Sequence, residues 1–166
     1  MSLEEHRKHA VREIKFSLVI TTDSRDENSD ISGRMMKDMI EDRGYTILST
    51  YFIKNDFDEI QRILQDLIRE KADIIIFSGG TGISSRDVTV DAIKPLFDKE
   101  LYGFGELFRY LSMKEIGSSA LLSRACAGVK DNSIIFCIPG SPNAVKLAME
   151  ELILKEAGHL LYEARK

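Results

Sequence analysis

Residues Ser78 to Asp87, with the sequence SGGTGISSRD, bring glycine, hydroxyl, cationic and acidic groups together in one short segment. Gly79, Gly80 and Gly82 allow positive φ angles and let the backbone approach a ligand oxygen without a Cβ in the way. Successive backbone N–H groups in such a loop form an anion-binding concavity. The spacing fits neither the G-x-G-x-x-G fingerprint nor the Walker A motif. A tight turn without a ligand is the alternative, but the polar residues that follow favour a phosphate site.

Arg86 and Asp87 end this loop. Arg86 offers a planar cation suited to phosphate, and Asp87 can hold Mg²⁺ or orient a substrate N–H group. The alternative is a local Arg–carboxylate pair that caps the next helix. Asp56 follows another expected strand, and two carboxylates beside phosphate oxygens suit a Mg²⁺–nucleotide site. Taken alone, Asp56 occupies the position of a helix N-cap.

Two further loops are expected at the same edge of the molecule, because ligands of open α/β sheets bind at the carboxyl ends of the strands. The first covers Thr22 to Gly33. The second is Pro139 to Pro142, with the sequence PGSP, which places the Ser141 hydroxyl and a free N–H group at the start of a helix.

Apolar runs alternate with helical patterns along the chain. Continuous apolar runs, typical of strands covered on both faces, span Phe16–Thr21, Ile74–Phe77 and Ser133–Ile138. Weaker patterns predict strands over Tyr45–Ile53 and Leu121–Val129. Helical spacing predicts helices from Ile31 to a stop at Gly44, from Phe57 to about Lys71, and over Thr89–Phe97, Gly103–Lys114, Ala144–Ala157 and His159–Ala164. We therefore expect an α/β, three-layer sandwich with a mostly parallel sheet, formed by a single domain over 15–166 after an N-terminal arm over 1–14.

The composition of the chain limits the kinds of partner that we expect it to bind. The 166 residues carry a formal net charge of −4, and this mildly anionic field disfavours nucleic acid. Cys126 and Cys137 lie in apolar runs, as buried thiols do, and the histidines give no support for a metal held by histidine. The first apolar stretch is too short for a signal peptide, and no run approaches the roughly 20 apolar residues that span a bilayer. We expect a cytoplasmic protein with no nucleic-acid and no membrane partner.

Taken together and in this order, the motifs resemble the molybdopterin adenylyltransferases of molybdenum cofactor biosynthesis, the MogA/MoaB group, and most closely the MoaB type. The resemblance covers nearly the whole chain. It rests on Thr22-Asp23 with Ser32-Gly33, the segment Ser78 to Thr89 with Asp91-Ala92, Ser119 with Ser123-Arg124, and Pro139 to Pro142 with Ala144-Val145. Departures are Ser78 for a usual Thr, Ser85 for a common Pro, and Lys54-Asn55 before Asp56.

The resemblance implies the molybdenum cofactor biosynthesis protein fold, and a reaction in which the terminal phosphate of molybdopterin attacks the α-phosphorus of Mg-ATP. It matches Asp56 and Asp87 to the family's two carboxylates linked to catalysis and Mg²⁺. By the same resemblance, Thr22 and Asp23 belong to the part of the site that binds the nucleotide. The residues matched to the pterin-phosphate pocket are Gly79, Gly80, Thr81, Gly82, Arg86, Ser119, Ser123 and Ser141. Gly140 and Pro142, on either side of Ser141, are further candidate binding residues.

The resemblance also implies a homo-oligomer, a trimer or a hexamer, and contacts with other molybdenum cofactor biosynthesis proteins. The apolar segment Gly103 to Met113 is a candidate for the subunit contact, with core packing as its alternative. One alternative function is a non-catalytic molybdopterin-binding carrier or scaffold paralogue. Another is a related domain that inserts molybdate, or a nucleotide-processing relative; it is less expected, because the molybdate-inserting domain normally sits in a much longer chain.

Overall fold

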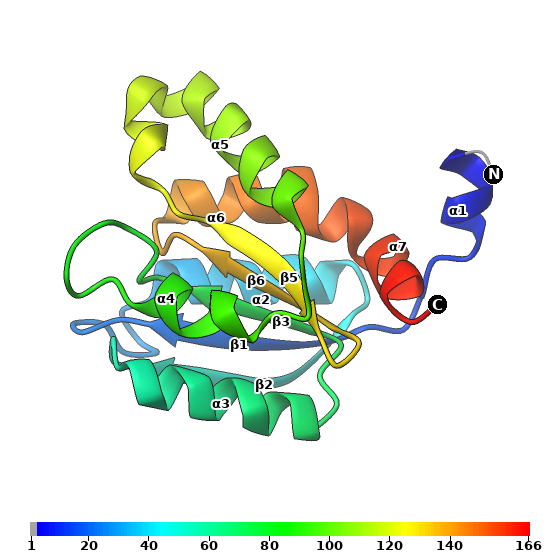
Figure 1. The fold of residues 1–166 in the computed structure, drawn as a ribbon, viewed down its shortest axis with the longest axis horizontal. Helices are drawn as coiled ribbons and strands as arrows, with labels where there is room; N and C mark the ends of the chain where they lie inside the picture. Colours follow the sequence, from blue (N-terminus) through cyan, green and yellow to red (C-terminus); the bar gives the residue numbers. More distant parts are fainter. Residues whose placement is uncertain (1–2) are drawn as a thin grey trace.

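The computed structural model describes residues 3–166, which form a six-stranded sheet with helices on both faces (Figure 1). The elements in chain order are α1 (Leu3–Lys8), β1 (Lys15–Thr21), α2 (Ile31–Asp42), β2 (Thr46–Ile53), α3 (Phe57–Arg69), β3 (Ile74–Ser78), α4 (Thr89–Ile93), the 3-10 turn η1 (Lys94–Leu96), β4 (Lys99–Glu100), α5 (Tyr102–Ile116), the 3-10 segment η2 (Gly117–Leu122), β5 (Cys126–Lys130), β6 (Ser133–Ile138), α6 (Pro142–Ala148), the π-helical turn η3 (Met149–Ile153) and α7 (Leu154–Ala164). The predicted three-layer α/β architecture is confirmed. No helix within 3–166 has the length and apolar character needed to cross a membrane.

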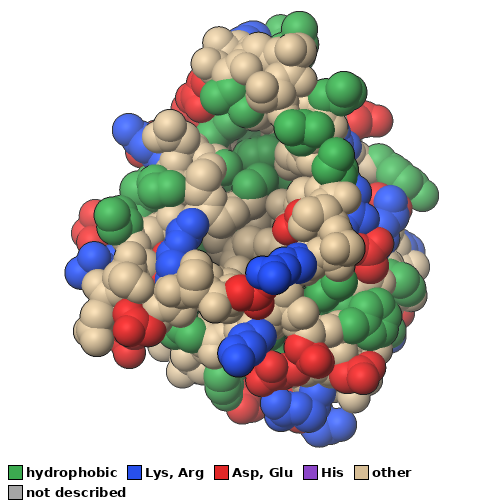
Figure 2. Space-filling model, turned by 90° about the vertical axis from the view of Figure 1, so that its left-hand side faces the viewer, with side chains coloured by type: hydrophobic (Ala, Val, Ile, Leu, Met, Phe, Trp, Pro, Cys, Tyr) green, Lys and Arg blue, Asp and Glu red, His purple; other side chains and the backbone are tan. Residues whose placement is uncertain are grey.

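The strands follow the order β2-β1-β3-β6-β5-β4, and the first four run parallel to one another. β5 and β4 add to this sheet in antiparallel fashion, so the sheet is mostly parallel. Ile20 of β1 pairs with Ser78 of β3, and Ser78 pairs with Ile138 of β6. The carboxyl ends of these three strands therefore meet at one edge, which Figure 2 turns toward the viewer.

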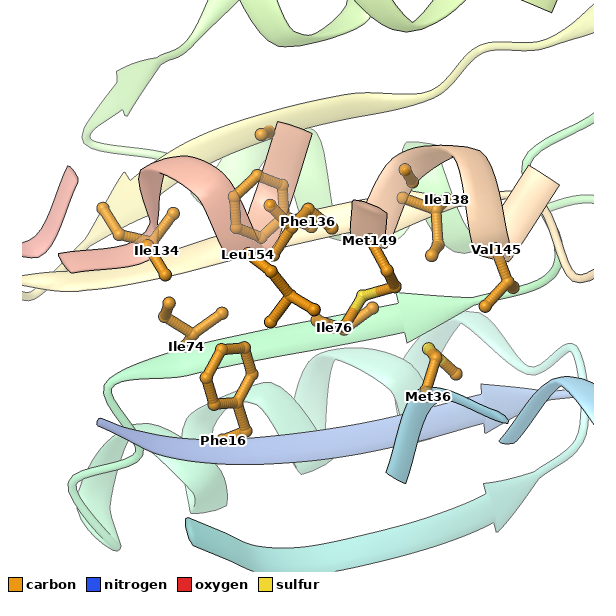
Figure 3. Packing of buried hydrophobic residues seen from close by; sticks show 14 of the residues in the cluster. Phe16, Met36, Ile74, Ile76, Ile134, Phe136, Ile138, Val145, Met149 and Leu154 are labelled. Carbon is orange, nitrogen blue, oxygen red and sulfur yellow. The ribbon is translucent and has the colours of Figure 1, made fainter. Parts of the chain in front are cut away.

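The strands alternate their side chains between two hydrophobic cores. On one face, residues such as Ile76 and Phe136 pack against α2, α5, α6 and α7, and Figure 3 shows them beside Met149 and Leu154. On the other face, residues such as Phe77 pack against α3 and α4. Because both faces are covered, the central strands carry no polar face, which explains their continuous apolar runs.

The strand predicted over Leu121–Val129 is wrong in its first half. Gly117–Leu122 forms the 3-10 segment η2, with Leu121 and Leu122 exposed, and the strand begins only at Cys126. β5 and β6 are joined by Asp131 and Asn132, whose φ angles are 48° and 66°. Positive φ at both positions is what a tight two-residue hairpin requires. The pairing with β6 thus decides where the strand starts, and the apolar pattern alone did not reveal it.

The C-terminal part of the chain is one continuous helical segment, where the sequence predicts two helices split at Gly158. It runs from Pro142 through the π-helical turn η3 to Ala164. Proline suits the first helical turn, where its missing N–H costs no hydrogen bond. Gly158 continues the helix and makes room for the arm, since a Cβ there would overlap the carbonyl oxygen of Val11.

The N-terminal arm packs along α7. The N–H of Val11 donates to the carbonyl of Gly158 at 3.0 Å, and the ring of His9 stacks on Tyr162 with the centroids 5.4 Å apart. Met1 and Ser2 of the predicted arm lie outside the described residues. This contact is at the end of the molecule opposite the carboxyl edge of the sheet (Figure 1).

Candidate functional site

The loops after β1, β3 and β6 enclose a cavity of 380 Å³ at the carboxyl edge. Figure 2 shows this face hollowed, with basic and acidic side chains close together around the hollow. The predicted site residues that line the cavity are Thr22, Asp23, Gly79, Gly80, Arg86, Asp87, Gly140 and Ser141. Residues separated by more than a hundred positions are thus brought together by the parallel pairing of three strands.

Gly79 and Gly80 give the loop its path. Their φ angles are +106° and +67°, a region that residues with a Cβ rarely adopt. A Cβ at Gly79 would overlap the carbonyl oxygen of Thr21, and a Cβ at Gly80 would lie 2.6 Å from Oδ1 of Asn55. The glycines therefore serve both the turn and the close approach of β3 to its neighbours.

The backbone N–H groups at the centre of the loop are free to bind a ligand. The N–H of Gly79 donates to the carbonyl of Ile138 at 2.9 Å. Within residues 3–166, those of Gly80, Thr81 and Gly82 donate to no protein acceptor. Consecutive N–H groups without a partner are typical of an anion-binding nest, so this geometry favours the predicted phosphate site.

Gly82 has a different role from the one predicted, because its φ angle is not positive. A Cβ at this position would lie 2.7 Å from Oδ2 of Asp87, so glycine leaves room for that carboxylate. The same oxygen accepts the Ser84 N–H at 3.0 Å. The N-cap position of α4 is Val88, without a side-chain cap, so the alternative of an Arg86–Asp87 pair capping the helix does not apply.

Asp23 contributes a charged carboxylate from the first loop. Its Oδ1 accepts the N–H of Asn55 at 3.1 Å. Hydrogen bonds from the backbone and side chain of Asn55 lower the pKa of Asp23, and the nearby charge of Arg86 lowers it further. Asp23 is therefore ionised at neutral pH and lies close to Arg86.

Several predicted residues lie outside this cavity. Asp56 is exposed and caps α3, with Oδ1 accepting the Glu59 N–H at 2.8 Å. Ser119 is exposed on η2, and Pro142 is the first residue of α6. Ser123 lines a second, larger cavity of 1030 Å³ between α4, α5 and η2. The two cavities share no lining residue.

Arg124 holds the glycine loop in place, a role that the sequence did not reveal. Its Nε donates to the carbonyl of Gly82 at 2.7 Å, and its Nη2 donates to the carbonyl of Asp87 at 2.9 Å. Two further bonds of 2.9 Å reach the carboxylate of Asp91. Its backbone N–H donates to the carbonyl of Thr81 at 3.0 Å. The Ser-Arg pair in the sequence was the only signal, and it did not specify these partners.

Buried oxygen atoms without partners surround the cavity. Among the described residues, the side-chain oxygens that accept and donate no hydrogen bond are Thr21 Oγ1, Asp30 Oδ1, Asn55 Oδ1 and Thr89 Oγ1. Three of these residues line the cavity. Native structures hold few such groups, and each calls for an explanation such as strain, a functional role, or an ordered water or ion.

The oxygen ligands of the cavity suit a Mg²⁺ ion that arrives with phosphate. The described residues contain no group of three or more His, Cys, Asp or Glu side chains arranged around a metal. Mg²⁺ needs no such cage, because it takes one or two carboxylates and completes its shell with water and phosphate oxygens. Asp23 and Asp87 are carboxylates of this kind. The metal role predicted for Asp56 stays a prediction.

Comparison with known proteins agrees with this geometry. Residues 16–159 match the family described as a probable molybdopterin binding domain. A molybdenum cofactor biosynthesis protein B from Bacillus anthracis is 44% identical over 165 residues, which cover 98% of each chain. A crystal structure of a molybdenum cofactor biosynthesis protein B is 41% identical with a TM-score of 0.89, over 92% of this chain and 96% of that one. The tungsten cofactor synthesizing protein MoaB from Pyrococcus furiosus is 36% identical with a TM-score of 0.87, over 95% of this chain and all of that one.

Arg124→Ala is expected to loosen the glycine loop. The carbonyls of Gly82 and Asp87 lose a charged donor, and bonds of this kind contribute roughly 1.5–3 kcal/mol each. We expect amide hydrogen exchange over 79–91 to become at least about tenfold faster. The control Arg62→Ala removes an exposed arginine of α3 and should leave this segment unchanged. Unaltered exchange in a folded Arg124→Ala protein would contradict the role assigned to Arg124.

The ion pair between Asp91 and Arg124 predicts a pH dependence of stability. Hydrogen bonding to Arg124 holds the pKa of Asp91 below its ordinary value of 3.8. The stabilisation is therefore fully present above about pH 4 and is lost as the pH falls through the lowered pKa. In urea unfolding at pH 7, the free energy of unfolding of wild type should exceed that of Asp91→Asn by about 1 kcal/mol or less, because the Asp91 side chain is half exposed. This difference should shrink on acidification, and growth of the difference would exclude the pairing.

Proposed function

The chain belongs to the molybdopterin-binding-domain family and acts in molybdenum cofactor biosynthesis, and we propose that it transfers the adenylyl group of Mg-ATP to molybdopterin. One observation carries the proposal. In a single cavity, the free N–H group of Gly80 lies with the side chains of Arg86 and Asp87. N–H donors, a cation and a carboxylate together suit phosphate groups that bring a Mg²⁺ ion.

The proposed reaction is a displacement at phosphorus. An oxygen of the terminal phosphate of molybdopterin forms a bond to the α-phosphorus of ATP. The bond from that phosphorus to the oxygen bridging to the β-phosphate breaks, and pyrophosphate leaves with the electron pair. A phosphate monoester has a second pKa of about 6 and is largely a dianion at neutral pH. The nucleophile therefore needs no general base, and the cavity is consistent with this, since no histidine or cysteine lines it.

The protein would contribute positioning and charge neutralisation, which dominate catalysis of phosphoryl transfer. In this proposal the N–H groups of Gly80, Thr81 and Gly82 hold phosphate oxygens. Arg86 stabilises the charge that develops on them. Arg124 keeps the N–H groups aligned through its bonds to the loop carbonyls, which avoids reorganisation during the reaction.

Mg²⁺ bound with ATP would neutralise charge on the phosphate oxygens. Asp87 is the predicted ligand that lines the cavity, and Asp23 is a second carboxylate there. Asp56 caps α3 in this structure. A ligand role for Asp56 would use Oδ2, because Oδ1 accepts the Glu59 N–H.

We assign the pterin to the second cavity, which Ser123 lines together with Tyr102 and Leu121. Its volume of 1030 Å³ and its mixture of apolar and polar groups suit a flat heterocycle better than a phosphate chain. α4 separates the two cavities, because Asp91 at its first turn lines the second cavity while Asp87 just before it lines the first. The terminal phosphate of the pterin would then reach the glycine loop from the α4 side.

A carrier that binds molybdopterin without turnover is the second candidate. The position of Asp56 favours it, because one of the two predicted catalytic carboxylates is exposed, caps a helix and lies outside the cavity. The carrier would use the same glycine loop and second cavity for binding alone.

Substitution of Asp87 separates the two candidates. With molybdopterin, ATP and Mg²⁺, the enzyme should release adenylylated molybdopterin and pyrophosphate in equal amounts, and EDTA should abolish both. Asp87→Asn should lower turnover by roughly a hundredfold or more while pterin binding and the folded state persist. The control Asp38→Asn removes an exposed carboxylate of α2 and should retain activity. A folded wild type that binds pterin but forms no product would identify a carrier.

We also propose that copies of this chain associate through α5 and η2. Seven of the twelve exposed large hydrophobic residues of the described chain lie in this region: Tyr102, Leu107, Tyr110, Met113, Ile116, Leu121 and Leu122. Leu121 is 84% exposed, and Leu121 and Tyr102 also line the second cavity, so the proposed contact would border that cavity. Figure 1 shows α5 extending beyond the body of the domain. A concentration of exposed apolar side chains marks an interaction site, and the homo-oligomer implied by the family resemblance provides its occupant.

The double substitution Leu107→Glu and Met113→Glu should therefore reduce the mass of the assembly. Both side chains are exposed in the single chain, so the fold should be retained while the charges oppose association. Light scattering coupled to size-exclusion chromatography should show a trimer or larger species for wild type and a monomer for the variant. Phe57→Glu on α3 is the matched control and should keep the wild-type mass. A wild-type monomer would exclude the contact.

A further inference from the structure

Arg25 is a second cation in the cavity of the glycine loop, and neither its type nor its spacing singled it out in the sequence. It lies in the loop after β1 and lines the cavity together with Arg86. Its guanidinium is loosely held, with Nη1 3.4 Å from the carbonyl oxygen of Gly140 and 3.7 Å from Oδ1 of Asp30. An arginine carries five N–H donors, so most of the donors of Arg25 remain free for a ligand.

The contrast with Arg124 shows what Arg25 is suited to do. Arg124 directs four hydrogen bonds of 2.7–2.9 Å at the glycine loop and Asp91, and it has little capacity left. Arg25 has its side chain 45% exposed and makes only the long contacts described above. One arginine is therefore committed to structure, and the other is available to an anion.

Asp30 aims Arg25 into the cavity. It is a carboxylate with only 1% of its side chain exposed, and its Oδ2 caps α2 by accepting the Gly33 N–H at 2.8 Å. Its Oδ1 has no hydrogen-bond partner and faces Arg25 at 3.7 Å. A buried carboxylate oxygen without a partner is costly, so the charge of Arg25 beside it is stabilised in this position.

Arg25 and the second cavity lie on opposite sides of the glycine loop along the sheet. Arg25 belongs to the loop after β1, which neighbours β3 on one side. The second cavity is lined by Glu100 of β4 and Cys126 of β5, and these strands lie beyond β6 on the other side of β3. A ligand that extends between the two cavities therefore passes the glycine loop, which follows β3.

We propose, on the basis of the proposed adenylyl transfer, that Arg25 binds the β- and γ-phosphates of ATP and so holds the pyrophosphate leaving group. Attacking and leaving oxygens lie roughly in line during displacement at phosphorus. A nucleophile that comes from the second cavity places the leaving group on the other side of the glycine loop, where Arg25 lies. The guanidinium neutralises the charge that pyrophosphate gains as its bond to the α-phosphorus breaks, and Asp30 acts as a positioning residue.

The experiment measures the affinity of the purified protein for three probes by calorimetry in the presence of Mg²⁺: ATP, inorganic pyrophosphate and AMP. Arg25→Ala should lower the affinity for ATP and for pyrophosphate by roughly tenfold to a hundredfold, which corresponds to the loss of one or two charge-assisted hydrogen bonds. AMP should stay within about twofold, because it lacks the phosphates that Arg25 contacts. Arg25→Lys should fall between Arg25→Ala and wild type, since lysine keeps the charge without the planar fork.

Arg34→Ala is the matched control, because it removes an exposed arginine of α2 that does not line the cavity, and all three affinities should match wild type. Thermal melting verifies that each variant is folded. Equal weakening of AMP and ATP by Arg25→Ala, or wild-type affinity for pyrophosphate, would overturn the inference. Loss of adenylyl transfer is a separate result, because wild type that binds ATP in an Arg25-dependent way but forms no adenylylated product refutes the proposed function and not the phosphate contact.

Discussion

The parallel pairing of β1, β3 and β6 is the constraint on which the site depends. Ser78 lies between Ile20 and Ile138 in the sheet, so the residues that follow each of these strands emerge side by side. Burial of both faces stabilises this arrangement, with Phe136 packed in one core and Phe77 in the other. The edge of the sheet then fixes the positions of the three loops that follow these strands, two of which are rich in glycine or proline.

The arginines around the carboxyl edge differ in how many hydrogen bonds they make within the protein. Arg124 has its guanidinium filled by loop carbonyls and by Asp91, and thereby fixes the direction of the free N–H groups. Arg86 and Arg25 line the cavity with donors to spare. In the proposed function, this division would let a chain with a net charge of −4 bind phosphate locally.

Preorganisation is a common theme of the described contacts. Ser84 holds the carboxylate of Asp87, Asn55 holds that of Asp23, and the Ser32 hydroxyl donates to the carbonyl of Gly140 at 2.9 Å. Each bond ties one loop to itself or to its neighbour before a ligand arrives. Chemistry that needs no proton transfer gains most from such an arrangement, because fixed dipoles and charges stabilise the transition state without reorganising.

The sequence by itself determined the layered α/β architecture, the main strands and the position of the glycine loop. Continuous apolar runs such as Ile74–Phe77 require a strand covered on both faces, and the glycines after it require an unusual backbone path. Asp56 was also recognisable as a helix cap, because that role depends only on residues within one turn. These features are local, so the chain encodes them in short segments.

The tertiary structure alone decided which residues share a cavity. Arg124 donates a hydrogen bond to Gly82, which is 42 positions away in the sequence, and Arg25 contacts the carbonyl of Gly140, which is 115 positions away. In the folded chain, Asp56 does not line the cavity of the glycine loop, and Ser123 lines the second cavity. It also starts β5 at Cys126, where β6 offers a partner, and not at the apolar Leu121. Contacts of this kind depend on strand order and helix docking, which hydrophobic periodicity does not specify.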